Sequence, residues 1–386
     1  MNPIAYYIAK LPIVRELLFY GFVRRLTPPV MVLQVTIVGG GIMGCATAYY
    51  LTKLGSERVQ VTLIERHRIA GHASGKAGGF LALDWCDGGP VEALARKSFQ
   101  LHEELATELG TNIDYRKLDT LSMAVEKGRA LQQKGIPAWV DGTVTRKGNM
   151  GTPKTTAQVH PELLTQALFR AAEKNGAKLI QGQVVQVHVE ASKVKSVQVK
   201  GRAQPIPADI VVIAMGPWSG LAQDWFPKAT IGRVTGSRAH SVVLDTSQHD
   251  ITPHALFLDI GSESPEIYPR PDGTIYMAGT TDGASLPEDP ADVSPDPEAV
   301  QKLVRMAGIV SGALERSPLV KGQACYLPCV GSGKPLIGQL KPYQGAFIAT
   351  GHTCWGILNG PATGLVLAEL ILTGKSNSVN IKHLMP

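Results

Sequence analysis

The residues with the clearest chemical meaning are a glycine-rich turn and an acid that follows it at a fixed distance. Residues 39–44 read GGGIMG, which fits the pattern GxGxxG, and Glu65 lies 21 positions beyond Gly44. Gly39 would permit a tight turn, Gly41 would let the backbone approach a pyrophosphate, and Gly44 would let a helix pack closely on a strand. An acid at this spacing can accept hydrogen bonds from ribose hydroxyls. The pattern therefore indicates a dinucleotide-binding site.

The sequence around this turn predicts the elements that must position it. Residues 32–38 are an apolar, β-branched run, residues 45–54 are small and apolar, and residues 59–64 are again strand-like. This predicts a strand–turn–helix–strand unit whose helix N-terminus offers free N–H groups and a partial positive charge to phosphates. Glu65 would repel a 2′-phosphate, which argues against NADP, although Arg66 stands beside it.

A second glycine-rich segment follows directly and separates flavin from nicotinamide. Residues 66–83 read RHRIAGHASGKAGGFLAL, in which Ser74 and Lys76 can reach phosphate oxygens. A nicotinamide enzyme needs no such loop after the ribose-binding acid. Here the sequence resembles the D-amino-acid oxidase (DAO) superfamily of FAD-dependent oxidoreductases, in which this segment lines the pyrophosphate and the flavin ring. The form ASGKAGG is most similar to a little-characterised eukaryotic branch of oxidoreductases.

Two further stretches match the same family. Residues 159–190 predict a helix after Pro161 and then a strand, and the resemblance implies that the backbone of Val185 lies against the adenine. Residues 208–220 predict a buried strand ending in a turn. There the resemblance implies that Gly216 permits close approach under the ADP and that Trp218 packs beside it.

The last matching stretch is a strand, a glycine-rich loop and a helix within residues 345–372. The helix N-terminus would stabilise negative charge on the pyrimidine end of reduced flavin. Gly351 and Gly356 keep this loop thin. His352 is interpreted as a packing or hydrogen-bonding group in preference to a catalytic base, because a single loop histidine proves little.

Departures from the family limit what the resemblance implies about the substrate. Amino-acid oxidising members carry an arginine that clamps the substrate carboxylate, and Leu327 stands at that position here. Arg270 or Arg233 could replace it, although a solvated surface residue is the preferred interpretation of each. Cys325 stands where some members attach FAD through a thioether, so covalent flavin is an alternative to the favoured non-covalent FAD.

Together the motif and the resemblance predict a set of cofactor-binding residues, and no metal ligands or catalytic residues are assigned. The predicted FAD-binding residues are Gly39, Gly41, Ile42, Met43, Gly44, Glu65, Arg66, Ser74, Gly75, Lys76, Ala77, Gly78, Gly79, Val185, Gly216, Trp218, Gly351, His352, Gly356 and Cys325. Tyr268, Arg270 and Trp355 are candidates for the substrate face, although aromatic core residues would look identical in sequence.

The fold class that follows is α/β (α+β overall), with a Rossmann-like FAD-binding domain and an antiparallel-sheet substrate domain. The predicted FAD domain is discontinuous and comprises residues 32–112, 155–226 and 321–386. The predicted substrate domain comprises residues 113–154 and 227–320, with a hairpin turn at Asp272-Gly273. Residues 285–299, rich in proline and acids, are expected to be a solvated connection.

We expect an FAD-dependent oxidoreductase that oxidises a C–N bond of a small amine or amino-acid-like compound by hydride transfer to flavin. The expected partners are a small-molecule substrate and O₂ or an unknown electron acceptor. Two alternatives stay open: an NAD-dependent dehydrogenase, and a flavin-bearing scaffold or trafficking protein with little turnover. The lost carboxylate arginine and residues 1–31 are the sequence features that support the second.

Composition excludes several other classes of protein. The chain has 386 residues, 44% hydrophobic and 18% charged, with a net charge of +6 and no basic block, so neither disorder nor nucleic-acid binding is expected. Its five cysteines include no CxxC, which favours an intracellular, cytoplasmic setting. Residues 1–31 form an N-terminal extension that carries net charge +3 and has no uninterrupted apolar run of membrane-spanning length, so no transmembrane segment is expected. An organellar presequence (mitochondrial or plastid) stays an alternative for this extension.

Overall fold

The computed structural model describes residues 32–131 and 133–386, and the expectations for residues 1–31 lie outside these ranges. Within the described residues, one large sheet has six strands. In spatial order they are β18 (Leu336–Gln339), β19 (Ala346–Thr350), β12 (Ile210–Ile213), β1 (Leu33–Val38), β2 (Val59–Glu65) and β8 (Lys178–Gln181). All neighbours are parallel except β18, which runs antiparallel to β19.

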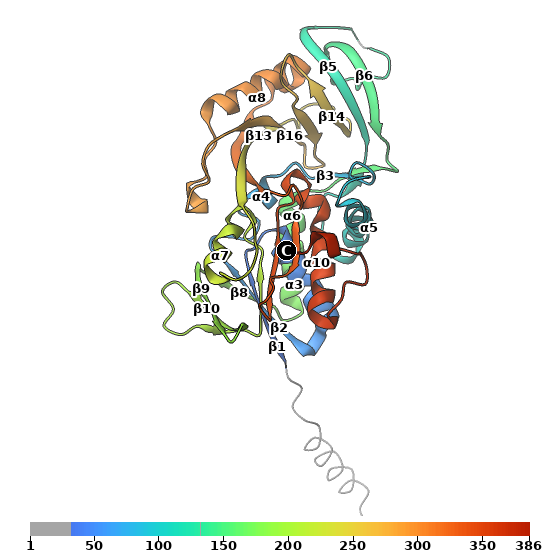
Figure 1. Cartoon of the computed structure of the whole chain (residues 1–386). Coiled ribbons are helices and arrows are strands. Elements are labelled where there is room, and N and C mark those ends of the chain that lie inside the picture. The colour runs from blue at the N-terminus through green and yellow to red at the C-terminus, as the bar shows by residue number, and fades with distance from the viewer. Residues whose placement is uncertain (1–31, 132) are drawn as a thin grey trace, which may run out of the picture.

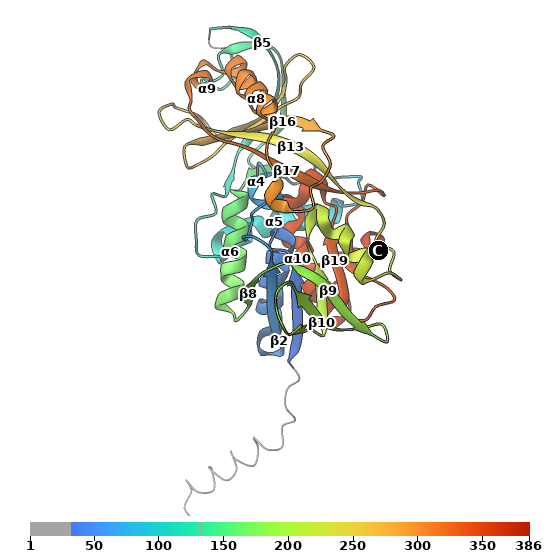
Figure 2. The same ribbon diagram turned by 90° about the vertical axis from the view of Figure 1, so that its left-hand side faces the viewer.

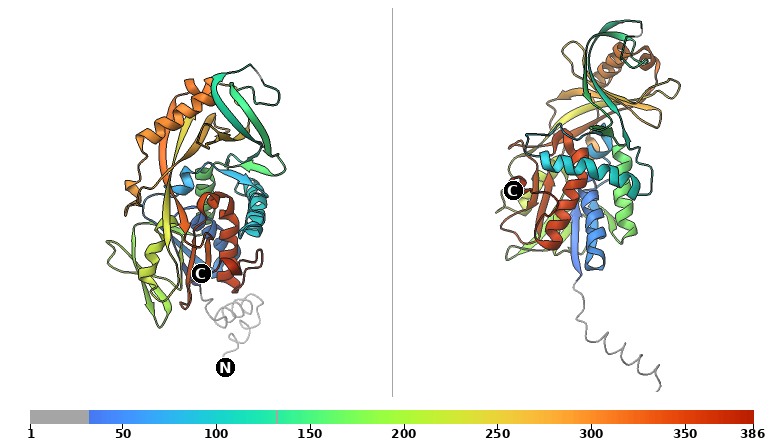
Figure 3. Two further views of the ribbon diagram at one scale, coloured as in Figure 1. Left: turned by 45° about the horizontal axis from the view of Figure 1, so that its top comes forward. Right: turned by 90° about the vertical axis from the view of Figure 1, so that its right-hand side faces the viewer.

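Successive strand residues point to opposite faces of a sheet, and helices pack on the apolar residues of one face of this sheet. Val212 on β12 and Ile37 on β1 pack on the helices, whereas Val211 and Ile213 pack on the opposite face. The helices, seen along one side of the sheet in the right-hand view of Figure 3, are α3 (Ile42–Gly55), α5 (Glu92–Glu108), α6 (Pro161–Lys174) and α10 (Gly356–Thr373).

The opposite face of the six-stranded sheet is covered by a small antiparallel sheet and by residues 216–231. The small sheet contains β9 (Val184–Glu190), β10 (Lys193–Val199) and β11 (Ile206–Pro207), and lies beside the lower half of the molecule in Figure 2. Phe226 and Ile231 complete this core from the segment that includes α7 (Ala222–Trp225). The sheet is thus buried on both faces, as its continuous apolar strands require.

A second large sheet lies above the first in Figure 1 and has seven strands in the described chain. In spatial order they are β17 (Leu319–Val330), β13 (Val234–Asp245), β16 (Thr274–Asp282), β15 (Glu266–Pro269), β14 (His254–Asp259), β5 (Asp119–Arg129) and β6 (Gly142–Gly151). The pairs are antiparallel except for β14 with β5. This sheet therefore agrees with the predicted substrate-domain architecture except at that one pair.

The two faces of the seven-stranded sheet have different partners. Ile267 and Met277 belong to the core beneath α8 (Pro297–Val310) and α9 (Gly312–Arg316), whereas Tyr268, Tyr276 and Ala278 belong to a cluster on the other face. Where the chain passes between the large sheets, it forms a small sheet of β3 (Phe80–Ala82), β7 (Thr156–Gln158) and β4 (Arg116–Lys117). The short helix α4 (Ala73–Lys76) precedes it.

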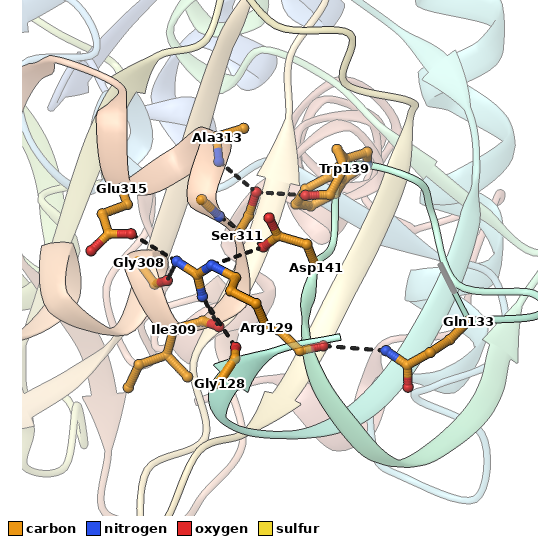
Figure 4. Close-up of polar contacts among 12 residues, drawn as sticks. Gly128, Arg129, Gln133, Trp139, Asp141, Gly308, Ile309, Ser311, Ala313 and Glu315 are labelled. Atoms are coloured by element: carbon orange, nitrogen blue, oxygen red, sulfur yellow. Dashed lines mark hydrogen bonds and ion pairs between the residues drawn. The ribbon is translucent and has the colours of Figure 1, made fainter. Parts of the chain in front are cut away.

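Polar contacts tie the β5–β6 hairpin to the helices on the outer face (Figure 4). Arg129 at the end of β5 donates to the carbonyl oxygen of Gly308 at 2.9 Å and pairs with Glu315 at 2.7 Å. Asp141 accepts from the Gly312 N–H at 2.8 Å, and the Ser311 hydroxyl donates to the carbonyl oxygen of Trp139. These contacts hold the outer face together and leave the opposite face of the sheet to the site.

The structure changes one predicted boundary and confirms the predicted hairpin. Tyr268 pairs with Tyr276 in the antiparallel register of β15 and β16, on either side of the turn at Asp272-Gly273. The segment from residue 321 was counted with the FAD domain, but β17 pairs along its length with β13 in the seven-stranded sheet. The sequence missed this because strand pairing between distant segments leaves no local signal. The division into two domains otherwise stays a prediction.

One described segment, Thr353–Thr373, has the length and apolar composition of a membrane span. In the protein, 67% of its most apolar stretch is buried, and α10 packs against α3 and α5. A helix that is apolar on all sides and enclosed by protein is typical of a domain core.

We predict that Gly44→Ala destabilises the protein by about 1–3 kcal/mol, the usual cost of overpacking a core. A Cβ at Gly44 would lie 2.0 Å from the carbonyl oxygen of Gly39, so α3 and the preceding turn would have to move apart. The measurement is urea unfolding. Gly283→Ala is the control, because a Cβ there meets nothing within 4 Å. Equal stability of the two variants would contradict the prediction.

Candidate cofactor and substrate site

A cavity of about 390 Å³ lies between the two large sheets. Its lower wall contains the turn Gly39–Met43 and Glu65, at the carboxyl ends of β1 and β2. Its upper wall contains residues of β13, β15, β16 and β17. The carboxyl edge of a parallel sheet is where α/β folds bind ligands, and here that edge faces the inner face of a second sheet.

The glycine-rich turn is held by contacts that exclude side chains. Gly39 has φ +112°, and a Cβ on it would lie 2.3 Å from the carbonyl oxygen of Ala214 on the neighbouring strand segment. The N–H of Ile42, in the first turn of α3, donates to Ser74 Oγ at 2.9 Å. The other N–H groups of this turn have no intrahelical partner, so the helix offers donors and its positive end to the cavity.

Glu65 links the turn to the segment that follows β2. Its Oε2 accepts from the Gly40 N–H at 2.7 Å, and its Oε1 accepts from the His67 N–H at 2.8 Å. Each carboxylate oxygen has a second lone pair, so ribose hydroxyls can still donate to it. The acid therefore both orders the dinucleotide turn and faces the cavity.

The connection between β16 and α8 reaches over this end of the cavity with residues 287–290. Asp289 pairs with Arg66 and lies 2.9 Å from His67 Nε2, and the Trp218 indole N–H donates to the Pro287 carbonyl oxygen at 2.8 Å. Residues 285–299 were expected to be a solvated connection. The structure agrees in that only Ala299 of these residues is buried, but it also places Glu288 on the cavity wall and starts α8 at residue 297.

The cavity wall carries buried polar groups that fit a polar ligand such as FAD. Within the described chain, both ring nitrogens of His72 and of His240 and the Thr280 hydroxyl are buried without a hydrogen-bond partner. Such groups are uncommon in folded proteins unless a ligand or water satisfies them. Burial lowers the pKa of His72 to about 4, so its imidazole is neutral and can donate through one nitrogen and accept through the other.

The N-terminal end of α10 forms another part of the wall. Gly356 and Ile357 line the cavity at the first turn of this helix. His352 lies just before it, with Nε2 3.1 Å from Thr363 Oγ1, and burial lowers its pKa to about 3. A neutral, buried imidazole with one nitrogen already used fits a hydrogen-bonding group better than a base.

Comparison with known proteins settles the family. The profile of the DAO family, described as "FAD dependent oxidoreductase", matches residues 34–370. The chain belongs to this family. It is therefore an FAD-dependent oxidoreductase, and its mixed α/β fold is the one expected from the sequence.

Relatives and solved structures agree with this membership. The Schizosaccharomyces pombe protein named "Putative oxidoreductase C1F5.03c" is 32% identical over 383 residues, covering 92% of this chain and 97% of that protein. A glycine oxidase of Bacillus licheniformis is 27% identical, covering 87% of this chain and 92% of its own. The fold is similar to the crystal structure of glycine oxidase from Geobacillus kaustophilus, with a TM-score of 0.75 and 22% sequence identity. The match covers 92% of this chain and 98% of that one.

The structure brings most of the predicted FAD-binding residues to one cavity. Those on its wall are Gly39, Gly41, Ile42, Met43, Glu65, Arg66, Ser74, Ala77, Gly78, Gly216, Trp218, Cys325, His352 and Gly356. The predicted residues that do not line it are Gly44, Gly75, Lys76, Gly79, Val185 and Gly351. Gly44, Gly75, Gly79 and Gly351 instead serve packing, since a Cβ on any of them would lie within 2.3 Å of a neighbouring atom.

Two of these differences concern the direction of a side chain. The side chain of Val185 is 41% exposed and that of its neighbour Val184 lines the cavity, because successive strand residues point to opposite faces. The contact of the Val185 backbone with the adenine stays a prediction. Lys76 Nζ donates to the Ala324 carbonyl oxygen at 2.9 Å, so it ties α4 to β17 and does not reach the cavity.

None of the three substrate-face candidates, Tyr268, Arg270 and Trp355, lines the cavity. Tyr268 is buried and stacks between Phe80 and Tyr276. Arg270 lies over the Tyr276 ring at 5.3 Å, and Trp355 packs against the helical core.

The residues that sequence reasoning missed on the upper wall include His240, Glu266, Tyr276 and Thr280. Tyr276 and Ala278 are two residues apart on β16, so strand alternation was the signal that could have found Tyr276. The ladder to β13 shifts register between Ala278 and Thr280, so alternation does not extend to Thr280. That signal becomes useful only when one knows which face of the strand is inward. Arg233 is exposed and lies off the cavity, so it does not replace the missing clamp.

We predict that Glu65→Gln lowers the affinity for FAD about tenfold. The amide nitrogen of glutamine is a donor, so it would face the N–H of Gly40 or His67 where a carboxylate oxygen now accepts. The measurement is titration of the apoprotein with FAD, followed by quenching of flavin fluorescence. Glu57→Gln, exposed on the turn before the same strand, is the matched control. An unchanged affinity in the Glu65 variant would show that this acid does not serve the cofactor.

Proposed function

We propose that this flavoenzyme oxidises a C–N bond of a small amine or amino-acid-like compound. The observation that carries the proposal is the continuity of the cavity, which extends from the dinucleotide turn to the inner face of the seven-stranded sheet. A small molecule held by that sheet would lie next to the cofactor. The glycine oxidases among the relatives support this reaction class.

FAD, when bound, supplies the acceptor for a hydride from the carbon that bears the nitrogen. The nitrogen lone pair then forms a C=N bond, and water hydrolyses this imine to a carbonyl compound and a free amine or ammonia. The electrons pass on to O₂ or to an electron acceptor. The protein has to orient the substrate and exclude water, and apolar wall residues such as Ile42, Ala278 and Leu327 suit the second task.

We propose that the wall residues bind FAD in order along the cavity. The turn Gly39–Met43 and Ser74 would hold the pyrophosphate, and Glu65 would hold a ribose. Ala77 and Gly78 would lie along the flavin ring, with the first turn of α10 at its pyrimidine end. The support is that all these groups lie on one cavity and that α3 and α10 both begin at it.

The test is anaerobic reduction of the bound flavin by a panel of amines and amino acids. We expect a yellow protein whose visible absorption is bleached by at least one C–N compound, with a carbonyl product that accounts for the flavin reduced. A protein that dithionite bleaches but no compound of the panel does would favour the scaffold alternative. A colourless protein that cannot be reconstituted with FAD would contradict the assignment of this cavity.

We predict that the flavin is held without a covalent bond. Cys325 lines the cavity, but burial raises the pKa of its thiol to about 11, and nearby Lys76 offsets only part of this rise. A thioether requires the thiolate as nucleophile, and a protonated thiol is a poor one. Acid precipitation should therefore release the colour into the supernatant, equally from the wild type and from Cys325→Ser. Colour retained in the wild-type pellet alone would establish the thioether.

A further inference from the structure

The inner face of the seven-stranded sheet carries a carboxylate that the cofactor site does not use. Glu266 on β15 lines the cavity. It shares its strand face with Tyr268, two residues on, and Tyr268 belongs to the cluster on the cavity side of the sheet. In the ladder to β16, Glu266 is opposite Ala278, another wall residue. The side chain of Glu266 therefore points to the half of the cavity away from the dinucleotide turn.

Glu266 has no cationic partner within the described chain. No lysine, arginine or histidine lies within 4.0 Å of its carboxylate, whereas nearby Glu263 pairs with Lys302 at 2.8 Å. The other acids on the wall are at the nucleotide end, where Glu65 is satisfied by two backbone N–H groups. Burial raises the pKa of Glu266, and the Tyr268 hydroxyl offsets part of this rise. A carboxylate enclosed in this way gains most from a cation brought by a ligand.

The same half of the cavity has no lysine or arginine on its described wall to pair with a substrate carboxylate. Among the described wall residues, Arg66 is the only arginine or lysine, and it is paired with Asp289 at the nucleotide end. Arg238 is bidentate on Asp282, and Arg270 lies against the Tyr276 ring, both off the wall. A buried carboxylate without a partner would be strongly disfavoured here, the more so beside another carboxylate.

We propose that Glu266 binds the cationic nitrogen of the substrate and that the substrate is an amine without an α-carboxylate. Transfer of one ammonium proton to the Glu266 carboxylate would free the nitrogen lone pair that hydride transfer requires. Ala278, Leu327 and Pro328 offer an apolar surface for the rest of a small alkyl or aryl amine. This inference rests on the proposed C–N oxidation and narrows its substrate class.

The test compares matched ligands on the holoprotein by perturbation of the visible flavin spectrum under anaerobic conditions. Isobutylamine, N-methylisobutylamine and benzylamine are the amines. Valine, of either hand, is isobutylamine with an α-carboxylate added, and isobutyrate is a carboxylate without the amine. We expect at least one amine to bind at least tenfold more tightly than both valine and isobutyrate. Failure of all three amines, or equal binding of valine, would overturn the inference.

Variants then assign the preference to Glu266. Glu266→Gln keeps the shape and removes the charge, so we expect amine affinity to fall about 10- to 100-fold with FAD retention unchanged. Glu266→Asp should restore part of the affinity. Glu263→Gln, on the same segment but paired with Lys302 away from the cavity, is the control and should bind the amine as the wild type does. Amine affinity that is unchanged in Glu266→Gln would refute the role of this carboxylate.

The readouts separate this inference from the proposed reaction. Amine binding without bleaching of the flavin would support Glu266 as the amine site and contradict C–N oxidation. Bleaching by valine as readily as by isobutylamine would support the reaction and contradict the substrate class. Thermal unfolding with each ligand gives the same comparison without using the flavin, because a ligand of the native state raises the transition temperature.

Discussion

The site depends on the close approach of helix α3 to the end of strand β1. A Cβ on Gly44 would lie 2.0 Å from the carbonyl oxygen of Gly39, and a Cβ on Gly39 would lie 2.3 Å from the carbonyl oxygen of Ala214. Both contacts require that no side chain be present. They fix the first turn of α3 at the carboxyl edge of the sheet, so its free N–H groups and positive end face the cavity. The second glycine-rich segment contacts this turn through Ser74, and α10 packs against α3.

This part of the molecule could be predicted from the sequence because its constraints act on the backbone over short distances. A glycine at a forced position, an apolar run before it and an acid at a fixed spacing leave a local record. The strand–turn–helix–strand unit and the hairpin at Asp272-Gly273 were found in this way. In each, the residues that determine the geometry are neighbours in the chain.

The substrate half of the cavity could not be predicted in the same way, because it depends on which face of each strand is inward. A shift of one residue along a strand reverses that choice. The same rule acts at the nucleotide end, where Val184 lines the cavity and Val185 is exposed. Tyr268 and Tyr276 flank the same predicted hairpin turn, and nothing in the sequence distinguishes them. In the structure, Tyr268 is enclosed by aromatic neighbours, whereas Tyr276 lines the cavity. The pairing of β17 with β13, which places Cys325 and Leu327 on the wall, joins distant segments.

The two halves of the cavity are therefore built on different principles. At the nucleotide end, backbone groups and glycines define the contacts, so the geometry tolerates little change. At the other end, side chains on one face of an antiparallel sheet define them, while the opposite face packs under α8 and α9 as a separate core. A residue such as Glu266 or Leu327 can differ without disturbing that core, since it does not belong to it. The specificity of the site is thus uncoupled from the stability of the sheet that carries it, whereas cofactor binding and the fold of the first sheet share the same glycines.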